Sequence, residues 1–348
     1  MKAVTVQPGV AGSVRYEDVP EPDEASGSVL VAAMAVGVCG TDVEIASGAY
    51  GWSPPGRDRL ILGHESLGRV IDPGPRSGLE HGDLVVGIVR RPDPVPCPNC
   101  AVGESDMCRN GQYTERGIKS IDGFMSERWR IEPEYVTRID PSLGLLGVLL
   151  EPTTVVTKAW ELVGSMRARA FWEPRSVLVT GAGPIGMLAA LIGVQYGLDV
   201  HVLDRVTEGA KPQLVRALGA TYHSGAVADV GVEPDVVIEC TGVGSLVLDS
   251  IRVVGAGGVV CLTGVGSGGR SGGLSPADVA REVVLQNNVI VGSVNANRRH
   301  FYRAAQALAA ADREWLGRLI TRRVPPERIA DALERGPDDI KVVVEFGG

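Results

Sequence analysis

VLVTGAGPIG occupies residues 177–186 and joins a short β-branched apolar run to a glycine-rich turn. An unbroken helical stretch follows, from Met187 to Tyr196. After a second short strand comes Asp204, eighteen residues past Gly186. This order of strand, turn, helix and acid is typical of the first unit of a doubly wound parallel sheet. The alternative is an ordinary glycine-rich turn in an α/β domain.

Each residue of the turn has a physical reason to be there. Gly181 allows a tight turn, Gly183 lets the backbone approach a pyrophosphate, and Gly186 lets the helix pack against the strand. Pro184 suits the first helical turn, where its missing N–H costs nothing. Free N–H groups at the helix N-terminus attract phosphates, and Asp204 is placed to accept hydrogen bonds from ribose hydroxyls. The pattern predicts dinucleotide contacts from Gly181, Gly183, Pro184, Ile185, Gly186, Asp204, Arg205, Thr241 and Gly264.

The sequence around this turn alternates between apolar strands and helices, which predicts a parallel sheet covered on both faces. The expected strands are residues 177–180, 200–203, 236–240, 259–263 and 289–294, and the expected helices are 184–196, 212–218 and 246–254. Residues 264–275 are rich in glycine and predict a mobile loop near the cofactor.

The first 150 residues differ from this part, because short β-rich pieces alternate with dense Gly and Pro turns. They predict an irregular β-barrel-like domain. The tail has a helical stretch at 300–311 and a strand at 342–345 that we expect to return to the first domain. We therefore predict an α/β protein with a catalytic domain at 1–155, a Rossmann domain at 156–297 and a returning segment at 298–348.

Composition narrows the class of protein. A chain of 348 residues with 44% hydrophobic and 22% charged residues is typical of a soluble globular protein with two domains. The net charge of −8 argues against nucleic acid or an anionic membrane as a partner. The N-terminus reads as a strand without a signal-peptide pattern, so we expect a cytoplasmic protein. Six Cys then favour metal sites and buried thiols over disulfides, and Cys240 and Cys261 are expected to be buried and inert.

Three separated residues form a candidate metal site. Cys39, His64 and Glu151 offer a thiolate, an imidazole and a carboxylate, which are zinc ligands, and three protein ligands leave a position for substrate. Taken singly, each has an ordinary explanation: a buried thiol, a surface or core histidine, and an acid at a helix N-terminus.

A second candidate site has three closely spaced cysteines, Cys97, Cys100 and Cys108. This spacing fits a closed structural zinc lobe, but the usual fourth Cys is missing. Asp93 or Asp106 could complete the ligand set, and a metal-free lobe is the alternative.

These motifs together resemble a known family. GVCGTD at 37–42, GHESLG at 63–68, GDLV at 82–85 and the Cys lobe, ahead of GAGPIG at 181–186, are similar to the zinc-dependent medium-chain alcohol dehydrogenases. A narrower resemblance, to the glucose dehydrogenase branch known from archaea, rests on RR at 90–91, DMC at 106–108, YTERGI at 113–118, DGFM at 122–125, Glu151-Pro152 and Val294-Asn295.

The resemblance implies a GroES-like catalytic domain and a catalytic zinc bound by Cys39, His64 and Glu151. Glu65 would be a further ligand or a neighbour of one. It also implies that substrate hydroxyls contact Thr41, Glu115, Glu151 and Asn295, and that the protein forms homodimers or homotetramers through the sheet domain. The incomplete Cys lobe departs from the family pattern and puts the second zinc in doubt.

The expected reaction is transfer of hydride from the anomeric carbon of an aldose, most simply glucose, to NAD(P), which gives a lactone. Zinc would make the hydroxyl acidic, and Thr41 could relay its proton or merely cap a turn. The 5% aromatic content suits a polar sugar site better than an aromatic tunnel. Glu115 could instead be a solvated surface acid, and Asn295 a turn residue.

The preferred nicotinamide depends on two adjacent side chains. Asp204 repels the additional phosphate of NADP, whereas Arg205 attracts it. We expect NAD to be preferred, with NADP use left open. Two alternatives to the whole interpretation remain: a dehydrogenase of another polyol, aminocyclitol or secondary alcohol, and a cofactor-binding protein without catalysis.

Overall fold

The computed structural model describes residues 1–266 and 276–347. It has two compact units, Met1–Glu151 with Ala296–Gly348, and Pro152–Asn295. The domain boundaries predicted above, after residues 155 and 297, lie within a few residues of these. Residues 267–275 of the predicted glycine-rich loop lie outside the described residues.

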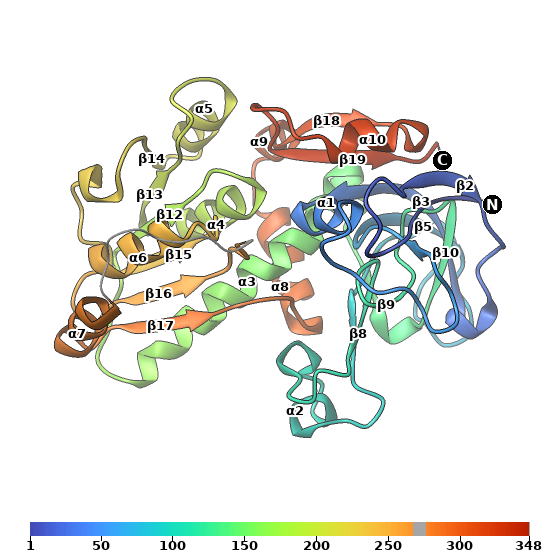
Figure 1. Ribbon diagram of the computed structural model, residues 1–348, viewed down its shortest axis with the longest axis horizontal. Helices are drawn as coiled ribbons and strands as arrows, with labels where there is room; N and C mark the ends of the chain where they lie inside the picture. Colours follow the sequence, from blue (N-terminus) through green and yellow to red (C-terminus); the bar gives the residue numbers. More distant parts are fainter. Residues whose placement is uncertain (267–275, 348) are drawn as a thin grey trace. The chain divides into compact units, whose positions relative to one another are not determined.

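The first unit is built mainly from β-strands (Figure 1). Its strands are β1 (Lys2–Val6), β2 (Arg15–Asp18), β3 (Val29–Val38), β4 (Leu60–Ile61), β5 (Glu65–Asp72), β6 (Leu84–Gly87), β7 (Arg90–Arg91), β8 (Thr114–Arg116), β9 (Ser120–Ile121), β10 (Arg128–Ile131), β11 (Val136–Arg138), β18 (Ile320–Val324) and β19 (Lys341–Glu345). Its helices are α1 (Gly40–Ala46), α2 (Pro98–Ala101), α8 (Arg298–Ala309), α9 (Arg313–Leu319) and α10 (Ile329–Leu333).

The largest sheet of this unit has the order β11-β6-β5-β3-β19-β18, with β10 also paired to β3. β19 runs antiparallel to β3, with Val343 opposite Gly37, so the C-terminal strand lies beside a strand of the N-terminal segment. Smaller sheets have the orders β2-β1-β4 and β7-β8-β9. The core between them holds Phe124 and Trp129, whose rings pack edge to face at 4.8 Å.

The second unit contains a six-stranded parallel sheet of order β14-β13-β12-β15-β16-β17. The strands are β12 (Ser176–Thr180), β13 (Asp199–Leu203), β14 (Thr221–His223), β15 (Val236–Glu239), β16 (Val259–Leu262) and β17 (Val289–Gly292). The helices are α4 (Pro184–Gln195), α5 (Ala210–Ala217), α6 (Gly244–Val253) and α7 (Pro276–Gln286), and α3 (Leu150–Ser165) leads into the unit.

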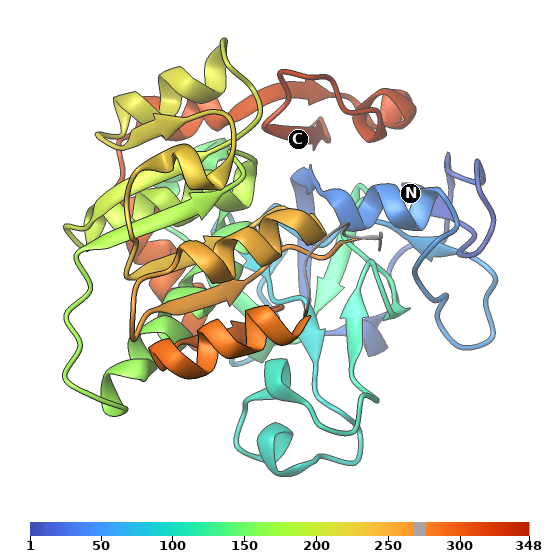
Figure 2. The same cartoon turned by 60° about the vertical axis from the view of Figure 1, so that its left-hand side comes forward.

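The strand order reverses direction between β12 and β15. Because parallel crossovers are right-handed, α4 and α5 cover one face of the sheet and α6 and α7 the other. Figure 2 shows the orange helices α6 and α7 in front of this sheet. The predicted doubly wound fold is confirmed, and sequence analysis missed β14 and α7.

Short 3-10 helices connect several of these elements. They are η1 (Glu24–Ser26), η2 (Ser105–Met107), η3 (Pro133–Tyr135), η4 (Pro141–Leu149), η5 (Met166–Ala168), η6 (Val227–Val230) and η7 (Pro326–Arg328). Among the described helices, none has both the length and the apolar character that a membrane span requires.

Candidate metal and nucleotide sites

Three potential metal ligands meet where β3 and β5 are neighbours. Cys39 follows β3 and caps α1, His64 precedes β5, and Glu65 begins it. One ligand atom from each lies within 4.8 Å of the other two, and Cys39 Sγ is 3.1 Å from His64 Nε2. Pairing of β3 with β5, with Gly37 opposite Glu65, brings these sequence-distant residues together.

A fully buried carboxylate that sequence analysis missed supports this group. Asp42 Oδ2 accepts a hydrogen bond from Cys39 N at 2.9 Å, and Asp42 Oδ1 lies 3.6 Å from His64 Nδ1. Burial acts to raise the pKa of Asp42, but His64, the hydrogen bond from Cys39 N and the Lys341 charge together outweigh it, and the pKa is lowered. Burial acts to lower the pKa of His64, but the Cys39 and Asp42 charges raise it well above its ordinary value. The pocket therefore favours positive charge and suits a cation.

Lys341 is a second residue that sequence analysis did not identify. Its Nζ, fully buried on β19, donates to Glu65 Oε1 at 2.7 Å and to Oε2 at 2.6 Å. A Cβ at Gly37 would collide with the Glu65 carboxylate, so a glycine is needed there. The only sign of this ion pair in the sequence is a lysine directly before an apolar run. The partner of that lysine, Glu65, lies 276 residues away.

Glu151, the third zinc ligand expected from the sequence, lies near this group without being part of it. The three ligand atoms that lie together come from Cys39, His64 and Glu65. Glu151 is 8% exposed in the first turn of α3. Burial raises its pKa to about 7, to which the Glu65 charge contributes. Its role as a ligand stays a prediction.

The predicted sugar contacts are Thr41, Glu115, Glu151 and Asn295. Thr41 N donates to Cys39 Sγ at 3.2 Å, so Thr41 lies in the first turn of α1, the helix that Cys39 caps. Asn295, in the second unit, has a left-handed backbone with φ of 60° after Val294, whose carbonyl accepts from Lys158 Nζ at 2.9 Å.

Glu115 is buried, with 5% exposure, which excludes a solvated surface acid. Its Oε1 accepts from Arg90 Nε at 3.0 Å and from Nη2 at 2.9 Å. The Arg90 guanidinium in turn stacks on the Tyr113 ring at 3.8 Å. Arg90 therefore fixes the direction of the Glu115 carboxylate.

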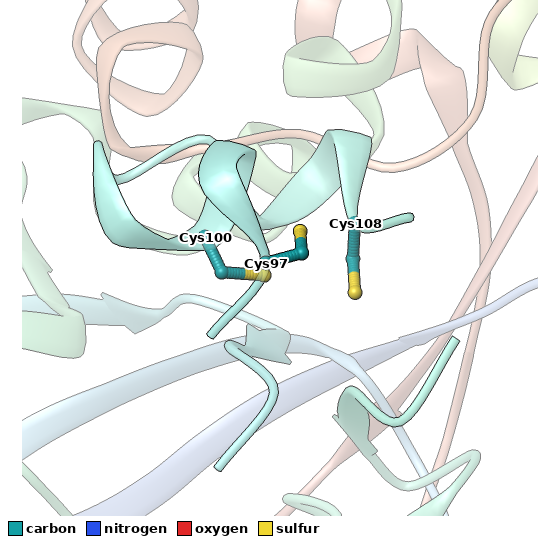
Figure 3. A group of neighbouring side chains, drawn as sticks. All are labelled: Cys97, Cys100 and Cys108. Carbon is teal, nitrogen blue, oxygen red and sulfur yellow. The ribbon is translucent and has the colours of Figure 1, made fainter. Parts of the chain in front are cut away.

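The second cysteine group is also brought together. The ligand atoms of Cys97, Cys100 and Cys108 lie within 4.8 Å of one another, at α2 and η2 (Figure 3). Hydrogen bonding, first from Arg109 N, lowers the pKa of Cys97 to about 6. Burial raises the pKa of Cys100 to about 11.

The two proposed fourth ligands of this lobe differ. Asp93 is buried, and its Oδ2 has no hydrogen-bond partner among the described residues. Asp106 Oδ1 accepts from Asn297 Nδ2 at 2.9 Å. Asp93 Oδ1 is also engaged, since it accepts from Val95 N at 2.8 Å. The ligand atoms that lie together are the three thiols alone, so the fourth ligand of this lobe stays a prediction.

In the second unit, the turn between β12 and α4 has the geometry expected for phosphate binding. Gly181 has φ of 93°, and a Cβ at Gly186 would collide with the Gly181 carbonyl. Gly183 caps α4, with Pro184 first in the helix, and among the described residues no atom lies within 4 Å of a Cβ built on Gly183. A pyrophosphate can therefore approach the helix N-terminus closely, and Ile185 lies in the same first turn.

Asp204 lies beside this turn and is held in place. Its carboxylate accepts from Ala182 N at 2.6 Å and from Val206 N at 3.1 Å. Lys211 Nζ, which sequence analysis missed, lies 3.7 Å away, and Arg205 is exposed. Asp204 thus has one cation, Lys211, at 3.7 Å and a second, Arg205, next to it in the chain; their part in the choice between NAD and NADP stays a prediction.

Thr241 and Gly264 follow β15 and β16 and lie close together, since a Cβ on Gly264 would collide with the backbone of Thr241 and Gly242. The thiols of Cys240 and Cys261 have pKa values of about 12, raised by burial.

Two family models cover most of the chain. Residues 25–141 match the family described as "Alcohol dehydrogenase GroES-like domain", and residues 144–346 match "Glucose dehydrogenase C-terminus". The glucose 1-dehydrogenase of Methanocella arvoryzae is 38% identical over 358 residues, with both chains covered in full. That of Thermoproteus tenax is 41% identical over 352 residues and covers 99% of each.

Solved structures give the same result. The glucose dehydrogenase of Haloferax mediterranei, in complex with NADP, Zn and gluconolactone, superposes with a TM-score of 0.92 at 33% identity over the whole of both chains. Galactitol-1-phosphate dehydrogenase from Escherichia coli, at 24% identity, shares the fold with a TM-score of 0.82 over 99% of this chain and all of the other. The chain belongs to the zinc-dependent medium-chain alcohol dehydrogenases, in the glucose dehydrogenase branch.

Proposed function

We propose that this protein is a zinc-dependent sugar dehydrogenase that oxidises an aldose, glucose foremost, at its anomeric carbon to the lactone, with NAD(P) as the hydride acceptor. The observation that carries the proposal is the group of Cys39, His64 and Glu65, of which the last two are buried, in a chain whose full-length relatives are glucose 1-dehydrogenases. A non-catalytic protein has no need of such a group.

The residues present fit both a zinc ion and a dinucleotide. Cys39, His64 and Glu65 would hold the ion, with Glu151 as the further ligand that the family resemblance suggests. Zinc acts as a Lewis acid that makes a hydroxyl group easier to deprotonate. Asp42 orients His64, since it faces the ring nitrogen opposite the one near Cys39. Lys341 holds the carboxylate of Glu65 in place.

The sugar is recognised by polar side chains in this proposal. Glu115 accepts hydrogen bonds from sugar hydroxyls with a carboxylate whose direction Arg90 fixes. Asn295 contributes an amide from the sheet unit. Thr41 relays the departing proton: its Oγ1 accepts that proton while its own hydroxyl proton passes on to water. Asp204 accepts from the ribose hydroxyls of NAD, which we propose as the preferred acceptor.

Initial rates test this function. We expect NADH formation with glucose well above that with galactose, xylose or simple alcohols, a lactone as product, and loss of the activity after zinc is removed by a chelator. Activity that is indifferent to metal removal would contradict the proposal. A faster reaction with simple alcohols would contradict the choice of sugar.

A second zinc in the cysteine lobe is part of the proposal, with Asp93 as the fourth ligand. The three thiols that lie within 4.8 Å of one another support it, and Asp93 Oδ2, which has no hydrogen-bond partner among the described residues, is the oxygen proposed to join them. We expect two zinc ions per chain by elemental analysis, one in Cys108→Ser, and two in the control Cys240→Ser. One zinc in the unaltered protein would show that the lobe is metal-free.

The protein also forms a homodimer or homotetramer in this proposal. The support is β17, which ends the sheet and exposes Ile290, together with Val284 and Leu285 of α7, which are 73% and 68% exposed. The cytoplasmic location expected from the sequence stays a prediction.

A further inference from the structure

A buried carboxylate that no expected step of the reaction uses lies at the carboxyl edge of the six-stranded sheet. Glu239 is the last residue of β15 and is fully buried. Among residues 1–266 and 276–347, no Lys or Arg forms an ion pair with it. Burying an isolated carboxylate is costly unless hydrogen bonds replace its water. The donors around Glu239 must therefore hold its charge.

These donors come from the turn after β15 and from β12. Glu239 Oε1 accepts from Thr180 Oγ1 at 3.3 Å, from Thr241 N at 2.8 Å and from Thr241 Oγ1. Glu239 Oε2 accepts from Gly242 N at 3.0 Å. The side chain thus joins the last residue of β12 to the first residues after β15.

The backbone of Glu239 joins a third strand. Its carbonyl accepts from Thr263 N at 2.8 Å, from Thr263 Oγ1 at 2.8 Å and from Gly264 N at 3.1 Å, just after β16. β12, β15 and β16 are adjacent in the sheet (Figure 1). Glu239 therefore fixes the ends of three neighbouring strands against one another.

This position coincides with the place where doubly wound sheets bind ligands. The strand order reverses between β12 and β15, and ligands bind outside the carboxyl ends of the strands at such a reversal. Three of the cofactor contacts predicted from the sequence adjoin groups that Glu239 holds: Gly181 follows Thr180, Thr241 is bonded directly, and Gly264 is bonded through its N–H.

Close packing makes the arrangement sensitive to small shifts. Gly242 has φ of 67°, and a Cβ there would meet the backbone of Val265 and Gly266. The turns after β15 and β16 thus touch through their backbones. A change in one carboxylate can displace both turns together.

We infer that Glu239 is a positioning residue for the dinucleotide, which sets the shape of the cofactor-binding edge by tying together the turns after β12, β15 and β16. The inference rests on the proposed function. It predicts that the charge of Glu239 matters for cofactor affinity and not for sugar recognition.

The chain offers a matched control at the other end of the same strand. Asp235 directly precedes β15, and its Oδ2 accepts from Arg175 N at 2.7 Å, Ser176 N at 3.0 Å and Ser176 Oγ at 3.2 Å. Asp235 thus joins β12 to β15 as Glu239 does, but at the amino edge, where such sheets do not bind ligands.

The experiment compares Glu239→Gln with Asp235→Asn. In Glu239→Gln an NH2 group replaces one carboxylate oxygen, so it must face an N–H or O–H group that donated to that oxygen. We therefore expect the Kd for NAD⁺ and NADH to rise about tenfold, measured by calorimetry on the unreacted protein. We expect a change of less than about twofold in Asp235→Asn. KM for glucose at saturating NAD should stay unchanged in both, while both unfold at lower temperature.

The remaining outcomes distinguish failure of the inference from failure of the proposed function. Equal Kd values in the two variants, despite lower unfolding temperatures, would reduce Glu239 to a structural residue and overturn the inference. If Glu239→Gln does not fold, Thr180→Val removes one donor to the same carboxylate and should raise the Kd by about threefold, and an unchanged Kd would equally overturn the inference. Failure of the unaltered protein to bind either NAD or NADP would instead overturn the proposed function.

Discussion

At the scale of single residues, the metal group depends on the buried ion pair between Lys341 and Glu65, one of the three candidate ligands. Lys341 and Glu65 are 0% and 2% exposed. Removing one partner of a buried pair leaves a charge without compensation, which is far more harmful than replacing both.

Lys341→Met tests this pair, because it keeps the apolar stem and removes the cation. We expect the metal-free protein to lose about 3–5 kcal/mol of unfolding free energy, measured in urea after chelation. Lys341→Arg keeps the charge and should lose clearly less. An unfolding midpoint in Lys341→Met equal to that of the unaltered protein would refute the importance of the pair.

Cofactor choice is also decided by single side chains. In Asp204→Asn the repulsion of the additional phosphate of NADP disappears, while Arg205 and Lys211 remain to attract it. We expect the ratio of kcat/KM with NAD to kcat/KM with NADP to fall at least about tenfold. Asp199→Asn changes an exposed acid at the start of β13, the strand that precedes Asp204, and should leave the ratio unchanged. An equal ratio in all three proteins would disprove this assignment.

At the scale of elements, the edge strand β14 is held partly by a histidine pair. His201 Nδ1 and His223 Nε2 are 2.8 Å apart, and Asp199 Oδ2 lies 3.2 Å from the other nitrogen of His201. Burial first, and His201 second, lower the pKa of His223. The hydrogen bond between His201 Nδ1 and His223 Nε2 holds one proton. A second proton on these facing nitrogens would make them repel each other.

A pH dependence of stability follows. The unfolded chain binds a proton on His223 more readily than the folded chain, so the contribution of this residue is full at high pH and declines as the pH falls below about 6.5. We expect the unfolding temperature to fall less between pH 8 and pH 5.5 in His223→Gln than in the unaltered protein. The exposed His81→Gln is the control, and identical pH profiles in all three proteins would contradict the argument.

At the scale of the whole molecule, self-association depends on one apolar sheet edge. Ile290→Lys places a charge on β17, and we expect light scattering after size-exclusion chromatography to show a smaller assembly than the unaltered protein forms. Val10→Lys changes a residue of similar exposure, 44% against 40%, in the other unit and should not alter the mass. A monomeric unaltered protein would refute the proposed assembly.

The sequence alone determined the class of fold, the family and the two cysteine-containing groups. The glycine turn and the apolar strands of the second unit are local signals, since each is read within about thirty residues. β14 escaped detection because Thr221–His223 is short and polar, and α7 because it follows a glycine-rich segment that looked like an extended loop.

Only the tertiary structure decided which charges lie together. Asp42 beside His64, Lys341 on Glu65, Arg90 on Glu115 and Glu239 across three strand ends are each set by strand pairing and burial. Pairing of β19 with β3 brings Lys341 to a residue far away in the sequence, and no local pattern encodes that encounter. A buried charge selects its partner through the cost of desolvation, which exists only once the chain has folded around it.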